Sequence, residues 1–199
     1  MSKKNVAVDK TEVQQETQAM MPPGSYLREN GVLWLNDKFD KENVYPLIVA
    51  IQEYNLMEEE LAPKQIKLFI NSPGGEVHWC LPLINAIKMS EIPVITIADG
   101  LAVSCGIMLL MCGDKRIATS NTSLMSHQYS AGSTGKEHEL YGRMKHFESI
   151  SDRAMHIYRK HTKKTEKYIR KHLLSPTDVW LTPEEALTHN IIDEIWETY

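Results

Sequence analysis

Short apolar runs alternate with longer amphipathic segments from residue 31 onward. The runs VLWL (32–35), IKLFI (66–70) and VITIA (94–98) have the length and the β-branched content of buried strands. Between and after these runs, apolar residues recur at helical spacing. Because strands that alternate with helices are typical of a parallel sheet covered by helices, the pattern predicts an α/β fold.

Strand runs and prolines refine the predicted boundaries. Two further short strands are predicted near residues 116–118 and 123–125. Asn43 is predicted to cap the helix after the first strand, because this keeps Pro46 in the first turn, where proline is tolerated. Pro82 lies inside a later helical run, and we expect it to kink or shorten that helix.

The longest amphipathic segment runs from about residue 137 to residue 160, with apolar residues every three or four positions. These residues are Leu140, Met144, Phe147, Ile150, Ala154, Ile157 and Tyr158. Packing on the sheet and docking on a partner subunit explain this stripe equally well. Further on, Thr182 and Glu185 form a capping-box pattern that predicts a helix start, and residues 191–196 predict a closing strand.

Composition narrows the class of protein. The chain has 199 residues and a net charge of -4, so we expect one compact domain without the basic surface that nucleic acids or anionic membranes attract. Its three cysteines are odd in number and lie in apolar sequence, which favours reduced thiols and a cytoplasmic location over a disulfide scaffold. The eight histidines are scattered, and no metal site is expected.

The N-terminus differs from the rest of the chain. Residues 1–22 are mixed in charge and lack aromatic residues, which predicts a mobile leader or pore segment ahead of one domain, residues 23–199. The longest apolar run, residues 101–112, is about half the length that a bilayer span requires. No membrane segment is therefore expected.

Ser104 is the first candidate for chemistry. It follows the strand run 94–98 and a short turn, and it precedes a wholly apolar helical run, so it lies where unpaired helix N–H groups stabilise anions. A serine at this position is either a nucleophile or a plain helix cap. Ala102 stands where a G-x-S-x-G nucleophile elbow requires glycine, which disfavours an α/β-hydrolase.

Four blocks of sequence carry a more specific signal. INSPGG (70–75), GLAVSCG (100–106), MSHQ (125–128) and TDVWLTPEEALTHNIIDEI (177–195) resemble, in order, the signature blocks of the Clp protease proteolytic subunit family. The similarity extends from about residue 25 to the C-terminus. It implies a crotonase-like α/β fold of repeated β-β-α units, with a protruding handle helix at about residues 137–160.

The resemblance also implies a site and an activity. Ser104 would be the nucleophile of a serine endopeptidase, His127 its general base and Asp178 the group that orients the imidazole. The backbone N–H groups of Gly75 and Cys105 would form the oxyanion hole. Substrate would bind as an added strand along a set of residues near this site. That set is Gly74, Gln128 and Tyr129.

The implied assembly is a homo-oligomer of two stacked seven-membered rings, joined through the handle helix. Its substrates would be unfolded polypeptides. These would be delivered by an AAA+ unfoldase of the Clp family, so that ATP is used by the partner and the subunit itself needs no cofactor. The implied location is the cytoplasm.

Several alternatives stay open. A ring subunit without catalysis, acting as a scaffold or regulator, would be expected to lack one of the three implied catalytic residues, and none is missing here. An acyl-CoA enzyme on the same fold would also use paired N–H groups, but it would not need Ser104, His127 and Asp178 together. A thiol mechanism at Cys105 or Cys112 is disfavoured, because neither has an adjacent positive charge in the sequence. The stretch LLSPT before Asp178 is longer than the family's usual spacing, which leaves open whether Asp178 reaches His127 in the resting state.

Overall fold

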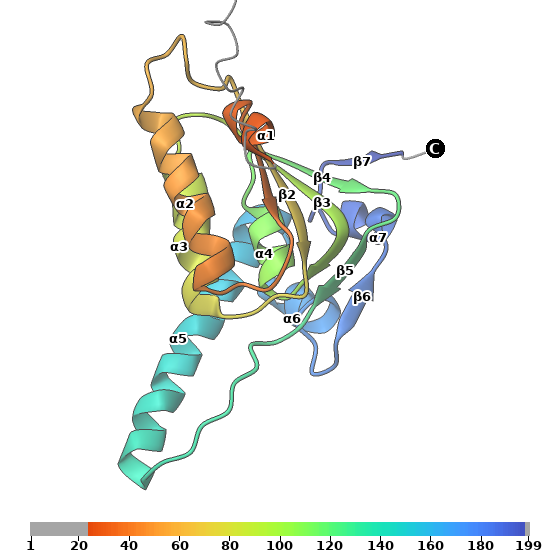
Figure 1. Cartoon of the computed structure of the whole chain (residues 1–199). Helices are drawn as coiled ribbons and strands as arrows, with labels where there is room; N and C mark the ends of the chain where they lie inside the picture. Colours follow the sequence, from red (N-terminus) through yellow and green to blue (C-terminus); the bar gives the residue numbers. More distant parts are fainter. Residues whose placement is uncertain (1–23, 198–199) are drawn as a thin grey trace, which may run out of the picture.

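A seven-stranded sheet covered by helices forms the body of the protein in the computed structural model, which describes residues 24–197 (Figure 1). The strands are β1 (Val32–Leu35), β2 (Ile66–Ser72), β3 (Val94–Val103), β4 (Lys115–Thr119), β5 (Ser123–Ser126), β6 (Val179–Leu181) and β7 (Glu194–Trp196). The helices are α1 (Ser25–Glu29), α2 (Lys41–Leu56), α3 (Val77–Met89), α4 (Cys105–Met111), α5 (Glu137–Thr162), α6 (Glu166–His172) and α7 (Pro183–Thr188). The predicted leader, residues 1–22, lies outside the described residues.

The main sheet has the order β1-β2-β3-β4-β7, and every neighbouring pair in it is parallel. β3 is long enough to pair twice. Residues 95–98 pair with β4, and residues 101–103 pair with β5, which in turn pairs with β6 in the antiparallel direction. The predicted α/β class with a parallel sheet is confirmed.

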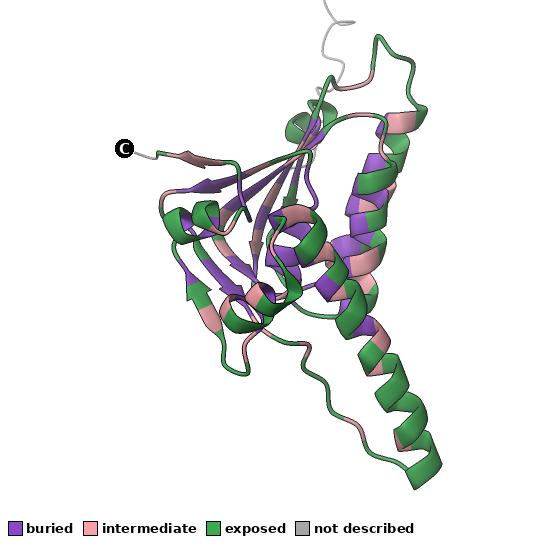
Figure 2. Cartoon of the chain, turned by 180° about the vertical axis from the view of Figure 1, so that it is seen from behind, coloured by how far each residue is buried: buried purple, intermediate pink, exposed green. Residues whose placement is uncertain are grey.

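The core lies between the sheet and the helices α2, α3 and α4. Residues alternate along β2, so that Ile66, Leu68 and Ile70 are fully buried while the residues between them are half-buried. All seven residues of α4 are buried, as the wholly apolar sequence from Cys105 to Met111 requires. Figure 2 shows that buried residues gather on the strands and on the helix faces turned towards them.

The predicted N-cap of α2 and the predicted shortening of α3 at Pro82 are wrong. The N-cap of α2 is Asp40, whose carboxylate accepts a hydrogen bond from the N–H of Asn43 at 3.0 Å, so Asn43 lies inside the helix and Pro46 beyond its first turn. Pro82 does not shorten α3, which continues through it to Met89. Burial of apolar α3 side chains on both sides of Pro82 offsets the hydrogen bond that the proline cannot donate.

The predictions for the C-terminal helix and strand agree better with the structure. Thr182 Oγ1 accepts a hydrogen bond from the Glu185 N–H at 3.3 Å, and the Glu185 carboxylate accepts one from the Thr182 N–H at 2.9 Å. The capping box and the start of α7 are therefore confirmed. The closing strand is shorter than expected, because only residues 194–196 pair with β4, while Ile191 and Ile192 are buried ahead of it.

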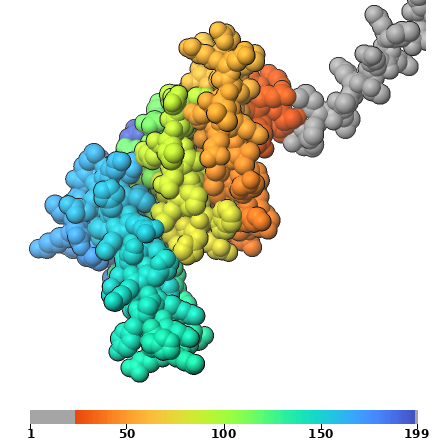
Figure 3. Space-filling model, turned by 90° about the vertical axis from the view of Figure 1, so that its left-hand side faces the viewer, coloured from red at the N-terminus to blue at the C-terminus, as the bar shows by residue number. Residues whose placement is uncertain are grey.

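α5 is the long helix that the apolar stripe predicted, and it spans residues 137–162. Its buried residues, Ile150, Met155, Tyr158 and Thr162, all belong to its C-terminal half. The N-terminal half projects from the body, as Figures 1 and 3 show. Within residues 24–197, no helix is both long enough and apolar enough to cross a membrane.

Candidate active site

Three neighbouring strands bring the candidate residues to one edge of the sheet. β2 and β3 are parallel, with Ser72 opposite Ala102, and β3 and β5 are parallel, with Val103 opposite Met125. The segments that follow these strands therefore leave the sheet side by side at its carboxyl edge. This edge is where open α/β sheets place their ligands.

Ser104 occupies a strained turn between β3 and α4. Its backbone has φ 57° and ψ -111°, a conformation that costs a residue with a side chain about 1–3 kcal/mol. The Ser104 N–H donates to the carbonyl of Met125 at 2.9 Å, which fixes the turn to β5. Although Ala102 replaces the first glycine of the elbow motif, the backbone turns sharply at the serine, as in such an elbow.

The Ser104 side chain makes no capping hydrogen bond to α4. Instead, its Oγ lies 2.7 Å from His127 Nε2, within hydrogen-bond distance. The interpretation of Ser104 as a plain helix cap is therefore wrong. Both side chains are half-buried, so the pair is reachable from the surface but partly shielded from water.

Glycine is required at both positions of the GG pair in NSPGG, because other parts of the chain approach the backbone closely there. A Cβ on Gly74, which has φ +94°, would lie 2.8 Å from the Cβ of Ser104. A Cβ on Gly75, which has φ +142°, would lie 2.6 Å from the backbone nitrogen of Phe39. No other residue fits at either position without moving the backbone that faces Ser104.

The N–H groups of Gly75 and Cys105, the predicted oxyanion donors, take no part in the backbone bonds around them. Phe39 bonds to the carbonyl of Gly74 and to the N–H of Glu76, so this bridge does not use the Gly75 N–H. Cys105 is the first residue of α4, and its N–H has no acceptor within the helix. Within residues 24–197, neither N–H donates to any carbonyl of a turn, loop or cap.

Asp178 is not bonded to His127. β5 and β6 pair Met125 with Trp180 and Ser126 with Val179, and His127 and Asp178 are the next residues beyond the end of this ladder. The Asp178 side chain is exposed, and no hydrogen bond joins it to His127 within the described chain. The structure thus brings two of the three predicted side chains into contact.

The other two predicted substrate-binding residues flank the same site. Gln128 is exposed, and its Nε2 donates to the carbonyl of Leu174 at 3.0 Å. Tyr129 is half-buried, and its ring lies 5.7 Å from that of Phe147 on α5. Both residues line the same pocket as Ser104 and His127.

An apolar pocket beside Ser104 and His127 was not predicted. It has a volume of about 70 Å³, and its apolar lining is Val77, Met108, Ile150, Ala154, Tyr158 and Leu174. Three of these residues, at positions 150, 154 and 158, belong to the apolar stripe of α5. Their spacing of four was visible in the sequence, but spacing cannot tell a pocket wall from a core or a subunit contact.

The three cysteines are free and buried. Burial raises the pKa of Cys80 well above its usual value and that of Cys112 to about 11. A hydrogen bond with the Cys80 thiol lowers the pKa of Cys105, and the backbones of Gly75 and Cys105 act in the same direction. Both of those backbones therefore lie close to one sulfur atom beside Ser104. Among residues 24–197, no three His, Cys, Asp or Glu side chains form a group that could hold a metal ion.

Comparison with known proteins identifies the family. Residues 15–199 match the family model described as Clp protease. A similar protein is the ATP-dependent Clp protease proteolytic subunit of Deinococcus radiodurans, which is 35% identical over 142 residues, or 70% of this chain and 69% of the relative. The resemblance of the four sequence blocks is confirmed, and with it the crotonase-like fold. The chain belongs to the Clp protease family of peptidases.

Proposed function

We propose that the protein is a serine endopeptidase that cleaves unfolded polypeptides, with Ser104 as nucleophile and His127 as general base. The observation that carries this proposal is the 2.7 Å contact between Ser104 Oγ and His127 Nε2. A serine hydroxyl becomes a useful nucleophile when a base at this distance takes its proton. The strained turn places the hydroxyl at the sheet edge, next to the backbone N–H groups of Gly75 and Cys105.

The chemistry follows from these positions. His127 Nε2 accepts the Ser104 proton while Oγ attacks the peptide carbonyl, and the N–H groups of Gly75 and Cys105 stabilise the resulting oxyanion. His127 then gives the proton to the leaving amine, and water hydrolyses the acyl-serine by the same route in reverse. Asp178 would orient the imidazole through its second nitrogen, which requires the carboxylate to turn from solvent towards His127.

Substrate would bind in an extended conformation between the segment at Gly74 and the segment at Gln128 and Tyr129. Main-chain hydrogen bonds along such a strand give affinity with little dependence on sequence. The apolar pocket beside Ser104 would take the side chain that precedes the cleaved bond. A preference for apolar residues at that position follows.

The proposed assembly is two stacked seven-membered rings that enclose the sites in a chamber. The projecting half of α5 supports this proposal, because it presents apolar side chains outside the body of the subunit. Folded proteins would not pass into such a chamber. A Clp-family AAA+ unfoldase that uses ATP is therefore the proposed partner, and the cytoplasm is the proposed location.

The test is the substitution Ser104→Ala, with peptide and casein cleavage as the measurement. We expect cleavage to fall by about 10⁴-fold or more, because no nucleophile remains, while native mass spectrometry finds the same oligomer. Ser123→Ala, an exposed serine at the start of β5, is the matched control and should cleave normally. Unchanged cleavage by Ser104→Ala would refute the assignment.

One observation favours the alternative of a ring subunit without catalysis, namely the missing hydrogen bond between Asp178 and His127. The wild-type chain decides between the two. A wild-type oligomer that neither cleaves peptide nor reacts with a fluorophosphonate would support the alternative. If it is active, Asp178→Asn should lower kcat by about 10⁴-fold, as expected for loss of the orienting carboxylate.

A further inference from the structure

Ser126 and Tyr158 form a buried pair of hydroxyl groups beside the site. Ser126 Oγ and Tyr158 OH are 2.6 Å apart, and the two residues are 0% and 1% exposed. In the described part of the chain, neither hydroxyl has another hydrogen bond that would replace this one. Burial raises the pKa of Tyr158, so its hydroxyl remains protonated and able to donate. Each group therefore depends on the other.

This pair lies where His127 leaves the sheet. The ladder between β5 and β3 ends at Met125, and the ladder between β5 and β6 ends at Ser126. His127 is the first residue beyond both ladders, and Asp178 does not hold its imidazole. Ser126 is thus the last residue before His127 that the fold fixes, through its backbone pairing to Val179 and through its side chain to Tyr158.

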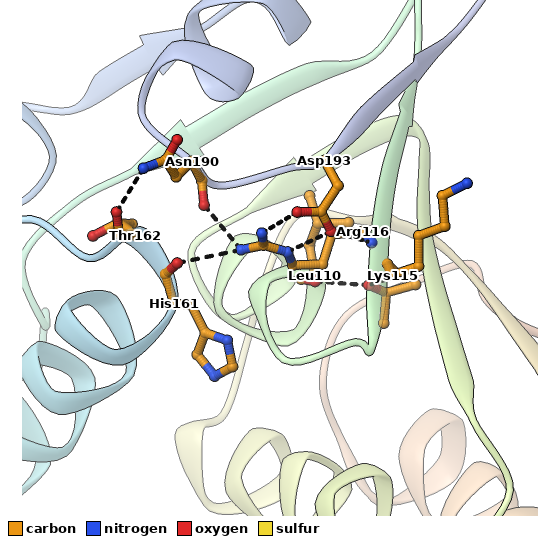
Figure 4. Close-up of polar contacts among 8 residues, drawn as sticks. Leu110, Lys115, Arg116, His161, Thr162, Asn190 and Asp193 are labelled. Carbon is orange, nitrogen blue, oxygen red and sulfur yellow. Dashed lines mark hydrogen bonds and ion pairs between the residues drawn. The ribbon is translucent and has the colours of Figure 1, made fainter.

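Tyr158 is itself fixed, because the last turn of α5 is anchored to the body (Figure 4). Arg116 donates to the carbonyl of Asn190 at 2.9 Å and to that of His161 at 3.5 Å. The Asn190 side chain donates to the carbonyl of Thr162 at 2.9 Å. Thr162 Oγ1 in turn donates to the carbonyl of Tyr158 at 2.7 Å. The helix that carries the tyrosine therefore keeps its place relative to the sheet.

We propose that Tyr158 is a positioning residue, whose hydroxyl holds Ser126 and thereby keeps His127 within hydrogen-bond distance of Ser104. This inference rests on the proposed function. The hydroxyl does not touch the reacting atoms. It restrains the backbone directly before the base, so that the imidazole meets the serine in one orientation even while Asp178 points to solvent. Small errors in such geometry lower the rate of the chemical step more than they weaken substrate binding.

The test is Tyr158→Phe, which keeps the ring in the pocket wall and removes only the oxygen. We expect kcat for a fluorogenic peptide to fall about tenfold, while KM changes less than about twofold. Labelling of Ser104 by a fluorophosphonate should slow by a similar factor. Tyr45→Phe, an exposed tyrosine on α2, is the matched control and should match the wild type in all three measurements.

The double variant Ser126→Ala with Tyr158→Phe separates positioning from stability. Either single variant leaves a buried hydroxyl without a partner and should lower Tm, whereas the double variant removes both groups and should recover most of the lost Tm. If Tyr158 positions the base, kcat of the double variant stays low, because the hydrogen bond between residues 126 and 158 is still absent. Recovery of kcat together with Tm would overturn the inference.

Two further outcomes are distinct from each other. An active wild type with an unchanged Tyr158→Phe variant overturns this inference alone. A wild type that neither cleaves peptide nor reacts with the fluorophosphonate contradicts the proposed function, and the inference falls with it.

Discussion

His161 lies in the last turn of α5 in a half-buried position surrounded by positive charge. Burial lowers its pKa to about 4, and the charges of nearby cations, including Lys88 and Arg116, act in the same direction. The imidazole is therefore neutral in the folded protein at neutral pH. In the unfolded chain, its pKa returns to about 6.5.

This difference predicts a pH-dependent stability. As the pH falls from about 6.5 towards 4, the unfolded state binds a proton at His161 that the folded state does not, so the free energy of unfolding falls. His161→Gln should remove this contribution, and the variant should lose about 1 kcal/mol less than the wild type between pH 7.5 and pH 5. Urea unfolding at the two pH values measures it. Equal losses in both proteins would contradict the assignment.

At this scale, the sequence predicted the residues of the site better than their contacts. Ser104 was identifiable from its place between a strand run and a helical run, whereas His127 and the two glycines were implied by the resemblance of the four blocks. The exposed position of the Asp178 side chain and the hydrogen bond between Ser126 and Tyr158 have no local signal in the sequence. They depend on χ angles and on packing between segments that are distant in sequence.

The helix α5 changes its role along its length. Ile150 and Tyr158 are buried against the body, whereas Tyr141 and Met144, on the projecting half, are 66% and 55% exposed. The apolar stripe of α5 is therefore buried against the body in its C-terminal half and exposed in its N-terminal half. Periodicity predicted the helix but could not mark where packing ends, because both environments select the same residue types.

Met144→Glu tests whether the projecting half joins subunits. A charge placed in an apolar interface is costly, so we expect the proposed particle of roughly 300 kDa, which fourteen chains of 22.8 kDa would form, to dissociate. Native mass spectrometry measures the particle. Met89→Glu, the same change at an exposed residue of α3, should leave the mass intact. An unchanged mass for Met144→Glu would exclude this surface as the contact.

The start of α2 shows that local capping rules alone do not fix a helix boundary. Asp40 and Asn43 are both good capping residues three positions apart, and local rules permit either. Asp40 is selected because its carboxylate reaches the N–H and the side-chain amide of Asn43 together. The helix thereby gains a turn, and Pro46 is tolerated deeper inside it than the sequence suggested.

On the scale of the whole molecule, Arg116 joins three distant segments. It lies on β4, bonds to the carboxylate of Asp193 before β7, and reaches the carbonyls of His161 and Asn190. Its side chain is only 14% exposed. One guanidinium group thus links the end of α5 and the segment before β7 to the sheet, in addition to strand pairing and apolar packing.

Arg116→Met should lower the free energy of unfolding by about 3 kcal/mol, because the Asp193 carboxylate keeps only the backbone N–H of residue 116 and two carbonyls lose the guanidinium donor. Arg170→Met breaks the exposed ion pair with Glu166 on α6 and should cost no more than about 0.5 kcal/mol. Urea denaturation of the two variants measures the difference. Equal costs would show that the Arg116 network adds nothing beyond a surface pair.

The overall topology was predictable only in part. Alternating strand and helix runs predicted the parallel sheet, because each period has a local hydrophobic signature. Periodicity could not predict that β3 pairs with both β4 and β5, or that β6 pairs with β5 in the antiparallel direction. Strand order and direction follow from contacts between segments that are distant in the sequence. The resemblance of the four blocks implied the crotonase-like fold of repeated β-β-α units but gave no strand order.

The carboxyl edge of the sheet holds Ser104 and His127, and their separation follows from the spacing of two hydrogen-bonded strands. The segment 57–65 connects α2 to the opposite, amino-terminal edge and is largely exposed. For protein engineering, this separation makes 57–65 the natural place to insert an affinity tag or a fluorophore, since added residues there leave the geometry of the nucleophile and its base untouched.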